Sequence, residues 1–267
     1  MVDQLLAAGA AAGPVLGLET GTPVARIGIV GEGRVMASVN RPARSHGADL
    51  PDLVDAAMAE AGLRMADLAA IAVGIGPGSF TGLRVGLSYA KGLIIASSLK
   101  LVGISSLDAM ALCGATRPEA SAGTAICPLI DARRGEVYTS LYRVGADALE
   151  RLSGDLVVTL EDFANQTAGE VVFVGEQKAQ EACAFVQRRG GGVGAHAGNA
   201  ELKLAGAYIA ALGAERIARG ESDRPESLEP RYVRPSGAAI NSATVNWKEG
   251  VENGTSRGRA NPAACRS

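Results

Sequence analysis

Residues 74–93 read Gly-Ile-Gly-Pro-Gly-Ser-Phe-Thr-Gly-Leu-Arg-Val-Gly-Leu-Ser-Tyr-Ala-Lys-Gly-Leu, and they carry the clearest structural signal in the chain. It continues an apolar run at 69–75, which is typical of a strand covered on both faces. A glycine-rich turn follows, and from about Thr81 to Ser98 the apolar side chains recur with helical spacing. A strand that enters a helix in this way predicts an α/β protein with parallel strands and right-handed crossovers.

The predicted helix at 81–98 is apolar on two faces. One face comprises Leu83, Leu87, Ala90 and Ile94. The other comprises Gly82, Gly86, Tyr89 and Leu93. A surface helix has one apolar stripe, so two stripes indicate burial against the sheet and against a second element. That element is either part of the same domain or a partner subunit, and both interpretations remain open from the pattern alone.

The turn itself matches none of three common enzyme motifs. The third glycine of a dinucleotide-binding loop is missing, no Gly-Lys-Ser/Thr follows, and Ser79 is not flanked by the glycines of a hydrolase nucleophile. Exposed amide groups at a helix N-terminus can bind an anion, which makes Gly76, Gly78 and Ser79 weak candidates for a nucleotide or anion site. The favoured interpretation is that the glycines only allow a tight connection.

Composition excludes several classes of protein. The 267 residues carry 26 Lys and Arg against 28 Asp and Glu, a net charge of −2, which does not fit a stand-alone nucleic-acid binder. The four cysteines form no C-x-x-C pair, and the two histidines, His46 and His196, lie far apart in the sequence, so neither a metal site nor catalytic residues are predicted. Scattered cysteines and the lack of a long apolar run predict a cytoplasmic protein without a membrane span.

Four segments are predicted along the chain. Residues 1–13 are expected to be an unstructured start, residues 14–114 an N-terminal α/β half, and residues 115–235 a C-terminal α/β half. Residues 236–267 contain few large apolar side chains among Ser, Asn, Gly and Arg, so a disordered tail is predicted there.

The stretch at 74–87 resembles the signature of the bacterial TsaB family, also called YeaZ. Four further segments resemble family motifs in the same order: Leu16–Thr20 (LGLET), Val102–Leu107 (VGISSL), Ile130–Tyr138 (IDARRGEVY) and Pro230–Arg234 (PRYVR). The resemblance covers about residues 14–235. It implies an actin-like, ribonuclease-H-like (ASKHA) α/β fold with mixed sheets in two related halves.

The resemblance also implies a role in making N6-threonylcarbamoyladenosine at position 37 of tRNA. In the family, the transfer chemistry belongs to a paralogue, TsaD, which holds a metal partly through an H-x-x-x-H pair that this chain lacks. The chain is therefore expected to be a non-catalytic subunit that forms a heterodimer with a TsaD-like paralogue, assembles with a TsaE-like ATPase, and meets tRNA only through the complex. No cofactor is expected in this chain, and ATP or ADP only at the interface of the complex.

Residues on two predicted helices are the candidates for partner binding, and the same residues would pair two copies of a lone chain into a homodimer. They are Leu50, Val54, Met58, Gly82, Gly86, Tyr89 and Leu93. Two positions depart from the family, with Glu19 in place of the usual Asp and Gly21 where Ser is common, which argues against a nucleotide site. The alternatives are a stand-alone actin-like ATP-binding protein or kinase and a peptidase-related protein.

Overall fold

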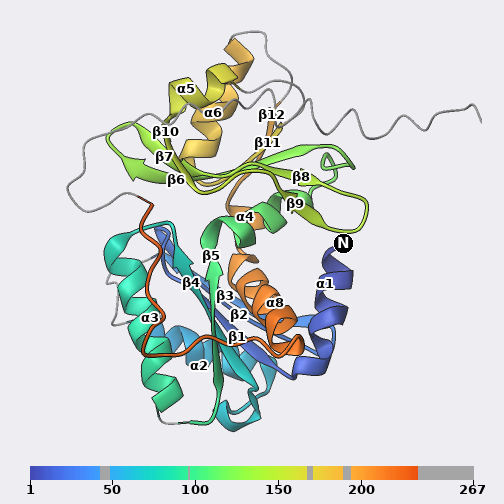
Figure 1. Ribbon diagram of the computed structural model, residues 1–267, viewed down its shortest axis with the longest axis vertical. Coiled ribbons are helices and arrows are strands. Elements are labelled where there is room, and N and C mark those ends of the chain that lie inside the picture. Colours follow the sequence, from blue (N-terminus) through green and yellow to red (C-terminus); the bar gives the residue numbers. More distant parts are fainter. Residues whose placement is uncertain (43–48, 96, 167–170, 189–193, 234–267) are drawn as a thin grey trace, which may run out of the picture.

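Two mixed β-sheets, one above the other, organise the protein (Figure 1). The computed structural model describes residues 1–42, 49–95, 97–166, 171–188 and 194–233. The predicted tail at 236–267 and His46 lie outside the described residues.

The first sheet has the strand order β3-β2-β1-β4-β5. Its strands are β1 (Val15–Glu19), β2 (Val24–Gly31), β3 (Arg34–Pro42), β4 (Ala70–Gly76) and β5 (Lys100–Ser105). Strand β1 runs antiparallel to β2 and parallel to β4, and β4 runs parallel to β5. The central strands are apolar on both faces, as a sheet covered by helices on each side requires.

The second sheet repeats this plan with the order β10-β7-β6-β11-β12. Its strands are β6 (Ala125–Arg133), β7 (Glu136–Thr139), β10 (Leu156–Thr159), β11 (Val171–Val174) and β12 (Gly194–Ala197), and β8 (Tyr142–Val144) and β9 (Leu149–Arg151) extend it beside β6. Strand β6 is antiparallel to β7 and parallel to β11, as β1 is to β2 and β4. The repeated topology confirms the predicted actin-like, ribonuclease-H-like fold of two related halves.

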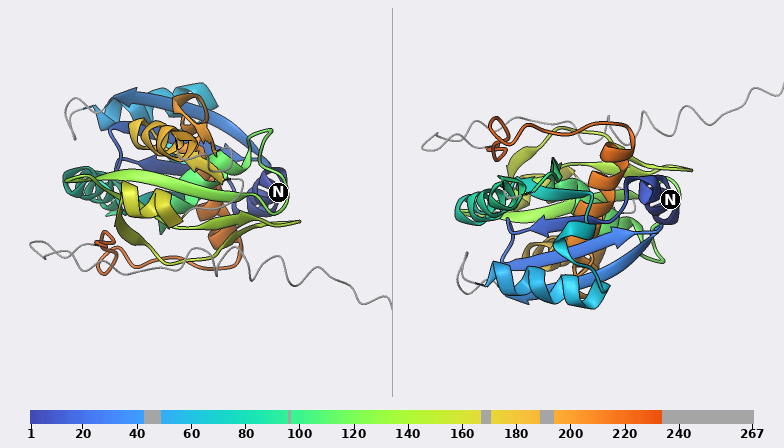
Figure 2. Two further views of the ribbon diagram at one scale, coloured as in Figure 1. Left: turned by 90° about the horizontal axis from the view of Figure 1, so that it is seen from above. Right: turned by 90° about the horizontal axis from the view of Figure 1, so that it is seen from below.

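Helices cover both sheets, and two of them lie between the sheets (Figures 1 and 2). The helices are α1 (Val2–Gly9), α2 (Leu50–Ala61), α3 (Phe80–Ile95), α4 (Ser106–Ala115), α5 (Leu160–Gln166), α6 (Gln177–Arg188), α7 (Asn199–Leu202) and α8 (Ala205–Ala218), with short 3-10 turns at Ala10–Ala12 and Met65–Asp67. Helices α2 and α3 cover one face of the first sheet and α8 covers the other. Helix α4 packs between α8 and the second sheet, whose outer side carries α5 and α6.

Glycines let α8 lie directly on the first sheet. A Cβ atom at Gly17 would stand 2.1 Å from the carbonyl oxygen of Gly206 in α8, and one at Gly28 would stand 2.2 Å from the Ala207 nitrogen. The resulting core joins both halves, because it runs from Val15 and Ala72 through α8 and α4 to Val172. The C-terminal half predicted at 115–235 therefore returns one helix, α8, to the first sheet.

The start of the chain differs from the expectation for residues 1–13. These residues form α1 and a 3-10 turn rather than an unstructured segment. Alanine-rich sequence favours a helix, and Leu5 and Leu6 pack against the core beside α8. Gly9 lies so close to α8 that a Cβ there would stand 2.7 Å from the Cβ of Ala214.

After α8 the chain forms a segment that we call the C-terminal strap, residues 220–233. It passes β5 and then reaches α3 (Figure 1). The Asp223 amide donates a hydrogen bond to the Leu101 carbonyl at 2.8 Å, and the Asp223 carboxylate accepts one from the Gly103 amide at 2.8 Å. The strap thus pairs with β5, the last strand of the first sheet.

Candidate functional site

Two turns meet at the N-terminus of α3. Glu19 ends β1 and is followed by a turn through Thr22, and Gly76 ends β4 and is followed by a turn through Ser79. The Ser79 amide donates a hydrogen bond to the Gly21 carbonyl at 2.7 Å, which ties the two turns together. A Cβ at Gly78 would stand only 2.4 Å from that same carbonyl oxygen. The glycine at 78 is therefore needed for close packing.

The candidate anion site is occupied by contacts within the chain. The Ser79 amide is bonded to Gly21, and the Ser79 hydroxyl accepts a hydrogen bond from the Gly82 amide at 3.3 Å, so Ser79 caps α3. Gly76 has a positive φ of 104°, and a Cβ there would stand 3.1 Å from the Arg231 carbonyl oxygen. Side chains at Gly76 and Gly78 would thus meet neighbouring atoms, and the Ser79 amide is bonded within the chain.

Glu19 is buried behind these turns. Its Oε1 accepts a hydrogen bond from the Gly21 amide at 2.6 Å, while its Oε2 is enclosed and has no hydrogen-bond partner. The Ser106 hydroxyl lies near the carboxyl group but outside hydrogen-bond geometry. Burial raises the pKa of the Glu19 carboxyl, and Ser106, the Gly21 amide and the Arg26 guanidinium offset part of that shift. An enclosed carboxyl group of raised pKa is a poor ligand for a phosphate-bound cation.

The residues predicted for partner binding lie mainly in the chain's own interior. Leu50, Val54 and Met58 of α2 are buried in the core under the first sheet. Gly82 and Gly86 of α3 are buried as well, while Tyr89 and Leu93 are half-buried against the same core.

Gly82 and Gly86, on the second apolar face of α3, pack against Thr20 in the turn after β1. A Cβ at Gly82 would stand 2.0 Å from the Thr20 carbonyl oxygen, and one at Gly86 would stand 2.2 Å from the Thr20 hydroxyl oxygen. That hydroxyl donates a hydrogen bond to the Gly82 carbonyl at 2.9 Å. Of the two interpretations left open by the sequence, the internal one fits Gly82 and Gly86, because Thr20 of this chain covers Gly82 with its backbone carbonyl and Gly86 with its side chain.

A third face of α3 is exposed and partly apolar. Phe80 is 49% exposed at the start of the helix and Ile95 is 85% exposed at its end. Tyr232 of the C-terminal strap, 42% exposed, stacks on Phe80 with ring centroids 5.2 Å apart. Arg84 lies over the Phe80 ring at 4.0 Å and donates a hydrogen bond to the Tyr232 hydroxyl at 3.1 Å. We call Phe80, Arg84, Ile95 and Tyr232 the α3 face.

Phe80 and Tyr232 lie within the segments 74–87 and 230–234 that resemble family motifs, but no role was predicted for either residue. Phe80 and Ile95 lie off both apolar stripes, and this position on the helix was the available signal. Tyr232 is distant in sequence from Phe80, so no local pattern could have placed it there.

The cysteine thiols and the potential metal ligands of the described residues form no further site. Burial raises the pKa of the Cys113 thiol to about 12 and also raises that of Cys127, so neither is a ready nucleophile at neutral pH. Within the described ranges, no group of three or more His, Cys, Asp or Glu side chains could hold a metal ion. No helix in the part of the chain that the structure describes is long and apolar enough to cross a lipid bilayer.

Comparison with known proteins extends this picture. A family model described as "TsaD: tRNA N6-adenosine threonylcarbamoyltransferase" matches residues 40–241. TsaB of Escherichia coli is 35% identical over 129 residues, 48% of this chain and 54% of that protein. TsaB of Bacillus subtilis is 31% identical over 150 residues, 56% of this chain and 63% of that protein. The chain thus spans about half to two thirds of the length of these curated relatives.

A solved structure gives the same fold. YeaZ from Pseudomonas aeruginosa superposes with a TM-score of 0.64 at 23% identity, covering 83% of this chain and all of that one. A second Pseudomonas aeruginosa structure, described as similar to peptidase YeaZ, gives a TM-score of 0.66 at 24% identity and the same coverage.

The two mixed sheets and the turns joined at α3 define an α/β protein of the actin-like, ribonuclease-H-like class. The chain belongs to the TsaD and TsaB (YeaZ) family.

The packing of α3 against Thr20 generates the first prediction. Gly82→Ala should lower the melting temperature, because its Cβ meets a backbone carbonyl oxygen at 2.0 Å and such overpacking costs about 1–3 kcal/mol. Gly92→Ala in the same helix is the control, since a Cβ there meets nothing within 4 Å. That control should instead stabilise the chain by up to about 1 kcal/mol. Equal melting temperatures for both variants would contradict internal packing of Gly82.

The buried carboxyl group generates the second prediction. Because folding raises the pKa of Glu19 above 4.5, its protonated form favours the native state, and this stability is present at low pH and lost as pH rises through the raised pKa. Glu19→Gln keeps the acceptor oxygen for Gly21 and cannot ionise. As the pH rises above 4.5, the melting temperature of this variant should fall less than that of the wild type. Each 1 kcal/mol of stability that the wild type loses corresponds to about 2–4 °C in melting temperature.

Exposed Glu226→Gln is the matched control and should leave the pH dependence unchanged. A Glu19→Gln variant that was less stable than the wild type at every pH would show that the native carboxyl group is ionised and needed as a charge.

Proposed function

We propose that this chain is a non-catalytic partner subunit in the formation of N6-threonylcarbamoyladenosine on tRNA. In this function it binds a TsaD-type transferase through the α3 face, and the pair assembles with a TsaE-type ATPase. One observation carries the proposal: the exposed large apolar side chains of the described residues, Phe80, Ile95 and Tyr232, all lie on α3 or against it. Exposed apolar side chains gathered on one element mark an interaction surface.

Charge on α3 supports a specific kind of partner helix. The sequence of α3 contains Arg84 and Lys91 and no acidic residue. Arg84 lies between Phe80 and Ile95 in the helix, so a helix that combines apolar side chains with carboxylates fits this face. We assign that helix to a TsaD-type partner, and the support for this is the family model of the transferase and the relatives named for threonylcarbamoyladenosine biosynthesis, to which this chain is similar.

The position of α3 suits docking. The helix lies at one edge of the molecule in every view, away from the layer that joins the two halves (Figures 1 and 2). Its inner faces are held by the sheet and by Thr20, so the outer face is presented by a rigid support. A rigid face loses little conformational freedom on binding.

A non-catalytic role agrees with the chemistry of the described residues. Glu19 is enclosed, the Ser79 amide is bonded to Gly21, and the thiols of Cys113 and Cys127 are buried. The catalytic groups of the complex are therefore assigned to the transferase. The net charge of −2 likewise assigns most tRNA phosphate contacts to other subunits.

The third prediction tests the α3 face. Ile95→Glu should abolish co-purification with the TsaD-type paralogue encoded in the same genome, because it buries an unpaired charge at an apolar contact. The melting temperature of the lone chain should change little, since Ile95 is 85% exposed. In cells depleted of the wild-type chain, the variant should also fail to restore threonylcarbamoyladenosine, measured by mass spectrometry of digested tRNA.

Gln187→Glu, at an exposed position of α6, adds the same charge elsewhere and is the matched control. A complex that survives Ile95→Glu would refute docking through the α3 face. A lone chain that modifies tRNA unaided would refute the non-catalytic role.

A further inference from the structure

The C-terminal strap connects the α3 face to the second half of the molecule. The Arg231 amide donates a hydrogen bond to the Ile75 carbonyl at 2.7 Å, which holds the strap beside the turn before α3. The Arg231 guanidinium donates to the Asp155 carboxylate at 3.2 Å, and Asp155 lies in the segment between β9 and β10. The next residue, Tyr232, stacks on Phe80. Arg231 and Tyr232 together therefore contact the first sheet at Ile75, the second sheet's loop at Asp155, and Phe80 of α3.

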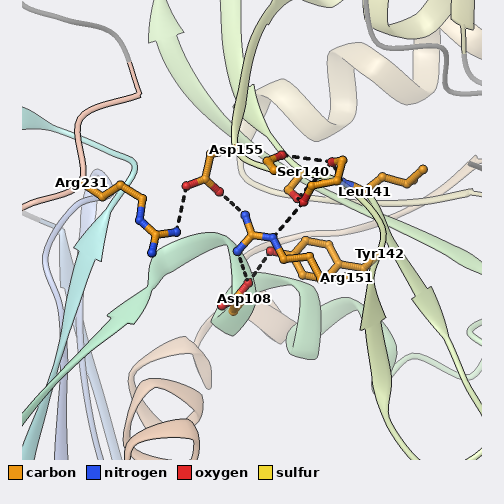
Figure 3. Close-up of polar contacts among 9 residues, drawn as sticks. Asp108, Ser140, Leu141, Tyr142, Arg151, Asp155 and Arg231 are labelled. Atoms are coloured by element: carbon orange, nitrogen blue, oxygen red, sulfur yellow. Dashed lines mark hydrogen bonds and ion pairs between the residues drawn. The ribbon is translucent and has the colours of Figure 1, made fainter. Parts of the chain in front are cut away.

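Asp155 is itself held in a chain of charged contacts (Figure 3). It pairs with Arg151, whose guanidinium also donates to the Asp108 carboxylate at 2.9 Å. Asp108 belongs to α4, between the sheets, and accepts a second hydrogen bond from the Tyr142 hydroxyl at 2.6 Å. The Asp155 side chain is only 7% exposed, so its position is fixed by its partners on both sides.

The backbone and the side chain of Arg231 make different contacts. Its backbone amide would keep the strap attached to Ile75 even if the side chain were removed. Its side chain, in contrast, reaches away from Ile75 to Asp155. Tyr232 is otherwise held by two exposed groups, the Phe80 ring and the Arg84 side chain.

We propose that Asp155 and Arg231 are positioning residues for the α3 face: their ion pair holds Tyr232 against Phe80, so that the docking surface depends on contact between the two halves. This inference rests on the proposed function, since it assigns the α3 face to the TsaD-type partner. It adds that the segment between β9 and β10 in the second sheet, which supplies none of the four side chains of that face, controls its shape.

The fourth prediction is a double-mutant cycle measured as affinity for the TsaD-type paralogue. Tyr232→Ala should weaken binding by about tenfold, as expected for an aromatic anchor. Arg231→Met should weaken binding by about three- to tenfold, and Arg231→Lys should restore part of the loss. Because Arg231 acts through Tyr232, the double variant should bind no more weakly than Tyr232→Ala alone. Arg64→Met, which removes an exposed ion pair with Asp67 on the surface, is the control.

A second measurement needs no partner. The chain has five tyrosines, so labelling with 3-fluorotyrosine gives a small set of fluorine signals, and the loss of one signal in Tyr232→Ala assigns Tyr232. In Arg231→Met and Asp155→Asn that signal should move towards the position of a fully solvated tyrosine. Arg64→Met should leave it in place.

The outcomes separate the two proposals. If Arg231→Met leaves both the fluorine signal and the affinity unchanged, or if its effect simply adds to that of Tyr232→Ala, the positioning role is overturned. If Ile95→Glu abolishes the complex while Arg231→Met binds as the wild type does, only this inference fails. If the complex survives Ile95→Glu, the proposed docking surface fails and this inference fails with it.

Discussion

The contact between Thr20 and α3 is the constraint on which the rest of the site depends. The Thr20 hydroxyl bonds to the Gly82 carbonyl, and its own carbonyl stands where a side chain at 82 would be. Helix α3 therefore cannot rotate about its axis without losing this contact. With one face against the sheet and another against Thr20, a single direction remains open to solvent, and Phe80, Arg84 and Ile95 lie on it.

Close packing at glycines, which have no side chain, also joins the two halves. Gly17 and Gly28 in the first sheet let the backbone of α8 lie against the strands, and α4 then packs on α8 beneath the second sheet. The core consequently runs through both halves without interruption. Charged contacts such as Arg26 with Glu176, and Arg151 with Asp108, cross the same boundary at its sides. The two halves are thus held in one relative placement by apolar packing at the centre and by ion pairs around it.

Much of the fold could be predicted from the sequence, because alternation and helical spacing report burial directly. The strand that ends at Gly76 and the helix that follows it at Phe80–Ile95 both follow from the apolar run and the helical spacing. The start of the chain could not be predicted in this way. Helix α1 is stabilised by contact with α8, which follows it by some two hundred residues, and a local pattern carries no information about so distant a neighbour.

The candidate site shows the same limit more sharply. The two apolar stripes of α3 were evident, but spacing cannot tell whether the covering atoms belong to the same chain or to another one. Gly86 and Val54 satisfy the pattern of an interface, but both are buried by other residues of the same chain. The exposed face was overlooked because single exposed apolar residues such as Ile95 are common on soluble proteins, and only the fold shows that Tyr232 joins Phe80 there.

The pairing of the C-terminal strap with β5 has a consequence for how copies of this chain behave in solution. Strand β5 would otherwise offer unpaired backbone groups at the rim of the sheet, and such a rim invites other chains to add strands to it. Asp223 forms hydrogen bonds with two of those groups, and the Arg216 guanidinium in turn donates a hydrogen bond to the Asp223 carboxylate. The strap therefore also protects the edge of the sheet against pairing with other copies of the chain. A binding partner that displaced the strap from β5 would have to form hydrogen bonds to β5 itself, or the exposed edge would promote aggregation of the chain.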